Sequence, residues 1–148
     1  MPENDVNSIL LVVGNSQNSH RAAQLAMTFS VNHSSNLLLL HIVDKMLVNR
    51  MKRVTGKSIS EIEVELEENG WKYLYHYEDK AKSQGIPVTL HQVNGVIENE
   101  IVNHANRFKT DLIIMAYPEK VSGQMKRLVK GHIEKTIETS KCSVLIVK

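Results

Sequence analysis

The chain has 148 residues and a formal net charge of +2, and its composition is 42% hydrophobic and 23% charged. This balance excludes a disordered chain, and the length suits one domain with its own core, over residues 1–148. The small net charge gives no reason to expect a nucleic-acid partner, and the longest apolar runs, Ile9–Val13 and Leu37–Leu40, are too short to cross a membrane. We therefore expect neither a nucleic acid nor a membrane as partner.

The N-terminal residues and the cysteine content indicate the compartment. Glu3 and Asp5 stand where a secretory leader would carry basic residues, and no such leader is recognisable. The one cysteine, Cys142, cannot form an internal disulfide. A cytoplasmic, reducing location is the simplest prediction.

The first third of the chain alternates between buried strands and one helix. Ile9–Val13 is a continuous apolar run that ends at Gly14-Asn15-Ser16, which is typical of a strand buried on both faces of a parallel sheet. A helix capped by Asn18 or Ser19 is expected to follow. Leu37–Val43 is the second buried strand.

Lys45–Lys57 is the least regular segment of the chain. It contains no acid and has no clean hydrophobic period, and its basic residues are Lys45, Arg50, Lys52, Arg53 and Lys57. We expect an irregular, solvated loop, with a polyanion site as the less favoured alternative. A further hypothesis is that this loop folds over the cleft as a lid.

A long helix is predicted to begin near Ser58 or Ser60, because each serine has a glutamate three residues later, as in a capping box. Gly70 inside it indicates either close packing or a kink. Gly85 suits the C-terminal cap. Further predicted elements alternate in type: strand 87–93, helix 96–108, strand 111–116, helix 123–139 and strand 144–147.

The predicted order of strands and helices is typical of a parallel sheet that is covered by helices on both faces. In such sheets a ligand binds beyond the carboxyl ends of the strands, where the strand order reverses. The segments to inspect are therefore Gly14–Ser16, Val43-Asp44, Asn94-Gly95 and Ala116–Gly131.

A phosphate site is the first chemical candidate. Ser122-Gly123 and Gly131 give a partial glycine-bearing loop before and within a helix, with positive charge nearby from Lys120, Lys126, Arg127 and Lys130. The alternative is that Gly123 merely begins the helix and that Gly131 permits close helix packing. The chain has no Walker-type lysine motif and no GxGxxG.

Catalytic and metal-binding patterns find little support. The seven histidines show no zinc spacing, and Cys142 has no evident base beside it. Gly14-Asn15-Ser16 is not the Gly-x-Ser-x-Gly elbow of a nucleophile. We predict no catalytic residues and no metal site, and hence a protein that is not an enzyme.

Four segments, in the right order, resemble the universal stress protein family. Residues 9–16 are similar to its first strand and Val-Asp-Gly-Ser turn, and residues 38–44 to its second strand. Residues 110–116 resemble Ala-Asp-Leu-Ile-Val-Met-Gly. The end of the chain, from Gly131 through residues 140–147, resembles the family's closing segment.

The resemblance implies a three-layer α/β/α fold with a five-stranded parallel sheet and the Rossmann-like topology of the adenine nucleotide alpha hydrolases. It also implies a homodimer paired through the last strand, Val144–Val147, and many members bind ATP. The nucleotide-binding positions that we predict for this chain are Gly14, Asn15, Ser16, Val43, Met115, Ala116, Ser122, Gly123, Lys126, Arg127, Gly131 and His132.

The chain departs from the family's ATP loop, which reads Gly, two residues, Gly, nine residues, Gly and then Ser or Thr. Gly131 fits the last glycine, but the two earlier positions hold Pro118 and Val121, and His132 replaces the hydroxyl. Gly14 stands where the family has an aspartate. A side chain at a close-approach glycine blocks backbone contact with phosphate.

Two further departures from the family's pattern concern the same loop, one a substitution and the other a difference in length. Ala116 replaces the glycine that ends the fourth strand, and the loop is about two residues longer than the family's. His132, or Lys126 with Arg127, could replace the missing phosphate contacts.

The leading hypothesis is therefore a dimeric stress-response module that acts by binding an unknown protein partner, without standard ATP binding and with no certain cofactor. The alternative is a member that binds ATP or another adenine nucleotide, with at most slow hydrolysis. An enzyme of unrelated chemistry in the same cleft is a third, disfavoured hypothesis.

Overall fold

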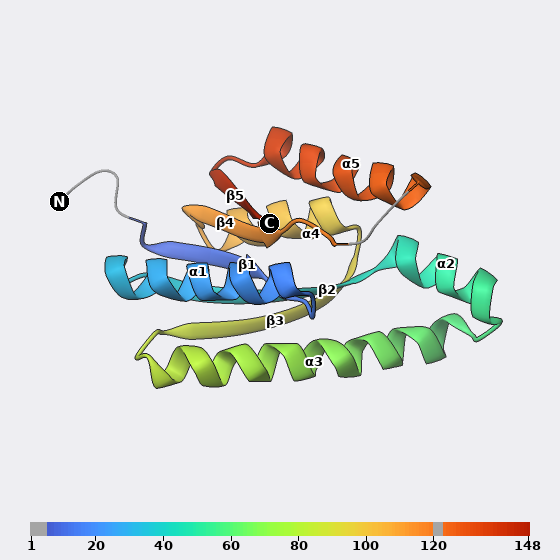
Figure 1. Ribbon diagram of the computed structural model, residues 1–148, viewed down its shortest axis with the longest axis horizontal. Coiled ribbons are helices and arrows are strands. Elements are labelled where there is room, and N and C mark those ends of the chain that lie inside the picture. The colour runs from blue at the N-terminus through green and yellow to red at the C-terminus, as the bar shows by residue number, and fades with distance from the viewer. Residues whose placement is uncertain (1–5, 120–122) are drawn as a thin grey trace.

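The computed structural model describes residues 6–119 and 123–148 (Figure 1). In these two ranges the elements alternate as the sequence predicts. Their bounds are β1 (Ser8–Val12), α1 (Gln17–His33), β2 (Asn36–Asp44), α2 (Lys45–Thr55), α3 (Ile59–Ser83), β3 (Val88–Gly95), α4 (Ile97–Arg107), β4 (Leu112–Ala116), α5 (Gly123–Thr139) and β5 (Ser143–Val147). No helix within the described ranges has the length and apolarity needed to span a bilayer.

All strands pair in parallel, in the order β3-β2-β1-β4-β5. Leu10, in the central strand, lies opposite Leu38 on one side and Ile113 on the other, and all three are buried. These three residues belong to the apolar runs of β1, β2 and β4, which form the centre of the sheet. The runs are apolar throughout because helices cover both faces of the sheet. The predicted parallel α/β fold is confirmed, and the strand order reverses between β1 and β4.

Helices cover both faces of the sheet and form a three-layer molecule. Alternate side chains of the strands face α1 and α3 on one side, where small and aromatic residues such as Ala26 and Tyr77 are buried. The other face packs against α4 and α5 through residues such as Ile101 and Ile133. Figure 1 shows α1 and α3 on one side of the sheet and α5 on the other.

The prediction that Lys45–Lys57 is irregular is wrong. Most of this segment is helix α2, which the Asp44 carboxylate caps by accepting a 3.0 Å hydrogen bond from the Met46 amide. Val48 is the only buried residue of α2, all of which is described. The apolar residues Leu47, Met51 and Val54 do recur at helical spacing, a period that the sequence analysis did not recognise.

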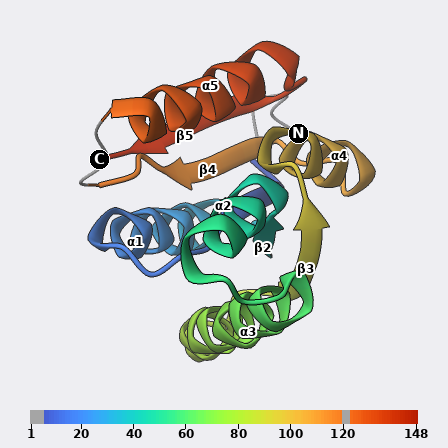
Figure 2. The same ribbon diagram turned by 90° about the vertical axis from the view of Figure 1, so that its right-hand side faces the viewer.

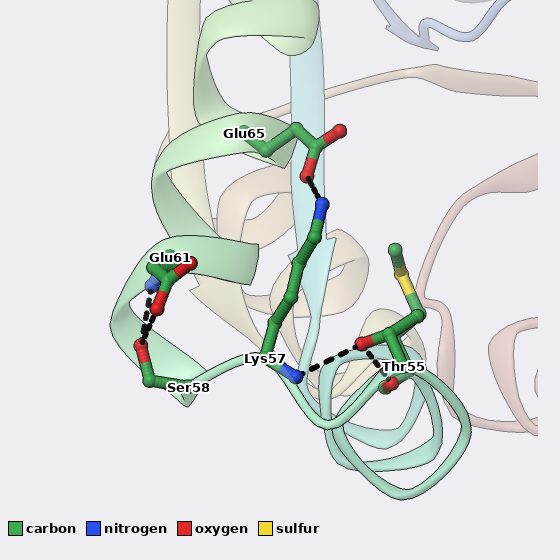
Figure 3. A network of polar contacts seen from close by, with 6 residues as sticks. Thr55, Lys57, Ser58, Glu61 and Glu65 are labelled. Atoms are coloured by element: carbon green, nitrogen blue, oxygen red, sulfur yellow. Dashed lines mark hydrogen bonds and ion pairs between the residues drawn. The ribbon is translucent and has the colours of Figure 1, made fainter.

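Local hydrogen bonds connect α2 to α3, as Figure 3 shows. Gly56 ends α2 in the left-handed conformation at φ 74°, and the Lys57 amide donates to Thr55 Oγ1 at 3.2 Å. Ser58 then caps α3 by accepting from the Glu61 amide at 3.2 Å. Of the two predicted starts, Ser58 is therefore correct, while Lys57 Nζ reaches Glu65 of the next turn at 3.4 Å.

Gly70 is in α3 because the helix packs closely on the sheet there. A Cβ at this position would overlap the amide oxygen of Gln92 and lie 2.6 Å from His41 Cε1. His41 Nδ1 donates a 2.7 Å hydrogen bond to that oxygen, and burial lowers the pKa of His41 below its ordinary value of 6.5. Of the two interpretations of Gly70, close packing is thus the one observed.

Candidate functional site

A pocket opens where the strand order reverses, at the carboxyl ends of β1 and β4. We call it the inner pocket. Its volume is about 160 Å³, and its walls are mainly apolar, which suits an uncharged ring better than a charged group. The lining residues are Val12, Val13, Ser19, Ile97, Met115, Ala116, Pro118, Val129, His132 and Ile133.

A second space, the outer pocket, continues from the first toward α2. Its volume is about 220 Å³, and it shares Ile97, Val129 and His132 with the inner pocket. We call the two together the cleft. Figure 2 views this edge of the molecule, with α2 between α5 above and α3 below. The remaining lining residues of the outer pocket are Asp44, Met46, Leu47, Arg50, Arg53 and Leu128.

His132 stands between the two pockets and is held by a buried carboxylate. Its Nδ1 lies 2.5 Å from Oε2 of Glu98, which is only 9% exposed. Lys135 Nζ lies 3.9 Å from the other carboxylate oxygen. A buried carboxylate needs such partners to offset its lost hydration. Because Nδ1 donates to Glu98, Nε2 is the ring nitrogen that can meet a ligand.

Asp44 adds a second carboxyl group near His132. Burial is the main cause that raises its pKa above the ordinary 3.8, and the charge of Glu98 raises it further. The amide hydrogen bond from Met46 and the charge of His132 act in the opposite direction. Asp44 is therefore a carboxyl group next to His132 whose ionised form is disfavoured in the folded protein.

The turn after β1 caps the N-terminus of helix α1. Ser16, a predicted ligand contact, is the N-cap: its Oγ accepts from the Ser19 amide at 3.0 Å. Beside it, the carboxylate of Glu119 accepts from the Asn18 amide at 3.0 Å. The N-terminus of α1 thus already has an anionic partner. A Cβ on Gly14 would lie 2.8 Å from Ser19 Oγ, so the turn is tight there.

The basic residues at the start of α5 lie outside the cleft. Gly123 adopts φ 61° and, with Lys126, Arg127 and Lys130, lines a separate open depression. Gly131 has no atom within 4 Å of the position that a Cβ would take. Among the described residues nothing packs against this position, which contradicts the alternative that Gly131 permits close helix packing.

The structure brings three of the predicted site residues together, since Met115, Ala116 and His132 all line the inner pocket. Val43 instead packs against Val48 and Ile62, with only 1% of its surface exposed. Asn15 is exposed in the turn after β1. Ser122 lies outside the described residues. The nucleotide-binding role of all these positions stays a prediction.

Several cleft residues were not predicted as site residues, among them Ile97, Arg50 and Arg53. Glu98, which binds the cleft residue His132, was not predicted either. Glu98 and His132 are 34 residues apart, and only the packing of α4 against α5 brings them together. For the two arginines a signal did exist, since the basic run was recognised. Because this run was predicted to be an irregular loop, the sequence analysis did not show that Arg50 and Arg53 lie on the same face of a helix.

The sequence profile described as "Universal stress protein family" matches residues 6–148. Among characterised sequences, the chain is 28% identical to "Universal stress protein MJ0531" of Methanocaldococcus jannaschii, over 99% of this chain and 84% of that protein. It is 27% identical to "Universal stress protein YxiE" of Bacillus subtilis, over 96% and 99% of the two chains.

Solved structures share the fold at lower sequence identity. UspA from Lactobacillus plantarum superposes with a TM-score of 0.77 at 17% identity, covering 99% of this chain and all of the other. A universal stress protein in complex with cAMP gives 0.68 at 19%, covering 97% and 98%. The Archaeoglobus fulgidus protein in complex with dAMP gives 0.68 at 13%, covering 97% and 99%. The Rossmann-like fold of the adenine nucleotide alpha hydrolases is thus confirmed.

Proposed function

Because this chain belongs to the universal stress protein family, we propose that it is a regulatory stress-response module that acts by binding, and that its cleft does not hold ATP in the family's usual manner. The observation that carries this proposal is the pair formed by His132 and the buried Glu98. His132 takes the place of the hydroxyl in the family's ATP loop. A carboxylate 2.5 Å from that imidazole offsets the attraction that His132 would otherwise have for a phosphate chain.

The N-terminus of α1 supports the same conclusion. Free amides at a helix N-terminus attract phosphate, but here Ser16 and Glu119 accept from the Ser19 and Asn18 amides. A triphosphate would have to displace the Glu119 carboxylate to reach them.

Calorimetric titration with ATP, ADP and AMP, with and without magnesium, tests the proposal. We expect the wild type to bind ATP no more tightly than AMP and to show no gain from magnesium. ATP binding at least about tenfold tighter than AMP binding, equivalent to about 1.4 kcal/mol, would contradict it.

A double variant supplies the matched comparison. Glu98→Gln with His132→Ser restores the family's hydroxyl and removes the carboxylate, and it leaves no unpaired buried charge. We expect this variant to gain affinity for ATP relative to AMP. His132→Ser alone is less informative, because it leaves Glu98 buried without its imidazole partner.

The second candidate function is the binding of another adenine nucleotide. The apolar inner pocket and the acidic group beside His132 suit an uncharged base with polar edges. Relatives of the same fold are described as complexes with cAMP and dAMP, each of which carries one phosphate. The same titrations, extended to cAMP and adenosine, distinguish this function from a cleft that has lost nucleotides altogether.

We further propose a homodimer that pairs through β5, and a protein partner as the output of the module. In support, β5 ends the strand order and has β4 as its one neighbour among the described strands. Its outer backbone groups are free to pair with a second copy. The assignment as a cytoplasmic protein without catalytic activity belongs to the same proposal.

A further inference from the structure

We propose that Arg50 and Arg53 of α2 form an anion site at the outer end of the cleft, and that this site holds the single phosphate group of a small nucleotide. The inference rests on the proposal that the cleft is the ligand site. It assigns the phosphate to α2, whereas the resemblance places it on the loop before α5.

The geometry of α2 places Arg50 and Arg53 on the wall of the outer pocket. Arg50 and Arg53 are three residues apart, so they share one face of the helix. Met46 and Leu47, one turn earlier on that face, line the same pocket. Lys52 lies between the two arginines in sequence but does not line the pocket. The face toward the cleft is thus apolar at its start and basic at its end.

The charges of this face form no ion pair among the residues that the structure describes. In residues 6–119 and 123–148, neither Arg50 nor Arg53 forms an ion pair, while Lys57, from the same basic segment, pairs with Glu65. Like charges three residues apart destabilise a helix. A phosphate between them would relieve this repulsion, and the planar guanidinium suits its oxygens.

The favourable interaction of a cation with the dipole at the end of α2 accounts for Arg53 but not for Arg50. Arg53 lies in the last turn, where a cation interacts favourably with the helix dipole. Arg50 lies before that turn and gains little from the dipole. Its position on the rim of the cleft is the feature that the anion site explains.

The distribution of charge along the cleft orients the ligand. Asp44 lines the outer pocket near His132, whose partner is the Glu98 carboxylate, and the inner pocket is mainly apolar. An uncharged base fits the inner part, and an anion is stable only at the basic rim. Together the two pockets reach about the lower end of the volume range of small-ligand sites, roughly 300–1,000 Å³. Such a volume suits one phosphate rather than three.

The test compares AMP with adenosine by calorimetry, in the wild type and in Arg50→Gln/Arg53→Gln. We expect the double variant to lose at least about tenfold in AMP affinity, because charge-assisted hydrogen bonds to the phosphate disappear, and to bind adenosine as the wild type does. Lys52→Gln is the matched control, since it removes one positive charge from the same helix outside the pocket. It should bind AMP within about twofold of the wild type, a difference well below one power of ten in affinity.

Three results would overturn the inference. The first is AMP affinity in the double variant equal to that of the wild type. The second is equal affinity of the wild type for AMP and adenosine. The third is loss of AMP binding in Lys126→Gln/Arg127→Gln alone, which would assign the phosphate to α5.

A different result would contradict the proposal that the cleft is the ligand site. If the wild type binds neither adenosine nor any nucleotide, the cleft is not a nucleotide site. In that case the anion site is tested with inorganic phosphate by NMR. Shifts of the Arg50 and Arg53 side-chain signals that are absent with chloride at equal ionic strength support it, and no such shifts overturn it.

Discussion

At the scale of single residues, the two glycines inside helices have opposite surroundings. Gly70 faces the hydrogen-bonded pair of His41 and Gln92, and a Cβ would overlap that pair. Gly131 faces open space. In sequence they look alike, because each interrupts an amphipathic helix without ending it. What distinguishes them is the partner across the helix, and for Gly70 the partners come from β2 and β3.

We predict opposite effects on stability when each glycine becomes alanine. Gly70→Ala should lower the free energy of unfolding by about 1–3 kcal/mol, because overpacking separates His41 from Gln92. Gly131→Ala should raise it by up to about 1 kcal/mol through helix propensity. Urea denaturation followed by circular dichroism measures both. Equal changes in the free energy of unfolding of the two variants would show that the close contact at Gly70 does not limit the side chain at that position.

Single residues also show which part of the cleft could be predicted from the sequence. The replacement of the family's hydroxyl by His132 is visible in the sequence. The carboxylate that holds this imidazole is not, since Glu98 lies near the start of a helix where an acid is ordinary. Its burial is a consequence of helix packing, which no local pattern records.

At the scale of elements, α2 is capped at both ends and amphipathic between them. Asp44 caps the first turn, Gly56 permits the left-handed end, and Val48 is buried with Met51 packed beside it. The sequence analysis missed this helix, although both capping residues are of the expected types and Leu47, Met51 and Val54 recur at helical spacing. Since α2 carries the lining residues Arg50 and Arg53, the cap also positions one wall of the cleft.

Two substitutions at Asp44 separate its capping role from its charge. Asp44→Ala should cost about 1 kcal/mol at neutral pH, because it removes the cap. Asp44→Asn keeps a cap of equal quality and removes a carboxylate whose ionisation is disfavoured in the folded protein, so it should be neutral or slightly stabilising.

The pH dependence of this effect has a definite sign. A raised pKa in the folded state means that ionisation of Asp44 lowers stability as the pH rises above the ordinary value of 3.8. The advantage of Asp44→Asn over the wild type should therefore be present at neutral pH and vanish below about pH 3.8. Thermal unfolding at pH 7 and pH 3.5 measures it. A constant difference at both pH values would contradict the assignment.

At the scale of the whole molecule, the free edge of β5 decides how two copies could pair. In a parallel strand the N–H and C=O of one residue point to the same side, and successive residues alternate. The carbonyl of Val147 accepts from the Tyr117 amide beside β4, at 2.8 Å. Leu145 therefore also faces β4, and Val144 and Ile146 present their backbone groups to the free edge.

Proline substitutions on β5 test the proposed dimer. Val144→Pro removes a donor from the free edge with little change in side-chain volume, so it should give a folded monomer. Leu145→Pro removes a bond to β4 and should destabilise the fold itself. Sedimentation equilibrium and circular dichroism separate these outcomes. A Val144→Pro protein that remains dimeric would exclude pairing through β5.

The order of the strands and long helices could be predicted from the sequence because each buried strand is a local, continuous apolar run and each long helix has a local apolar period. Of the N-caps, that of α3 was predicted at Ser58 or Ser60 and lies at Ser58, whereas α1 is capped by Ser16 and not by Asn18 or Ser19. Segments such as Ile9–Val13 and Leu37–Val43 need no distant information to be recognised. The cleft is different: Asp44, Arg50 and His132 line it, and Glu98 holds His132 in place. These residues come from three connections far apart in the chain. The charge and shape of the cleft depend on which faces of α2, α4 and α5 meet at the reversal of strand order, and only packing in three dimensions specifies that.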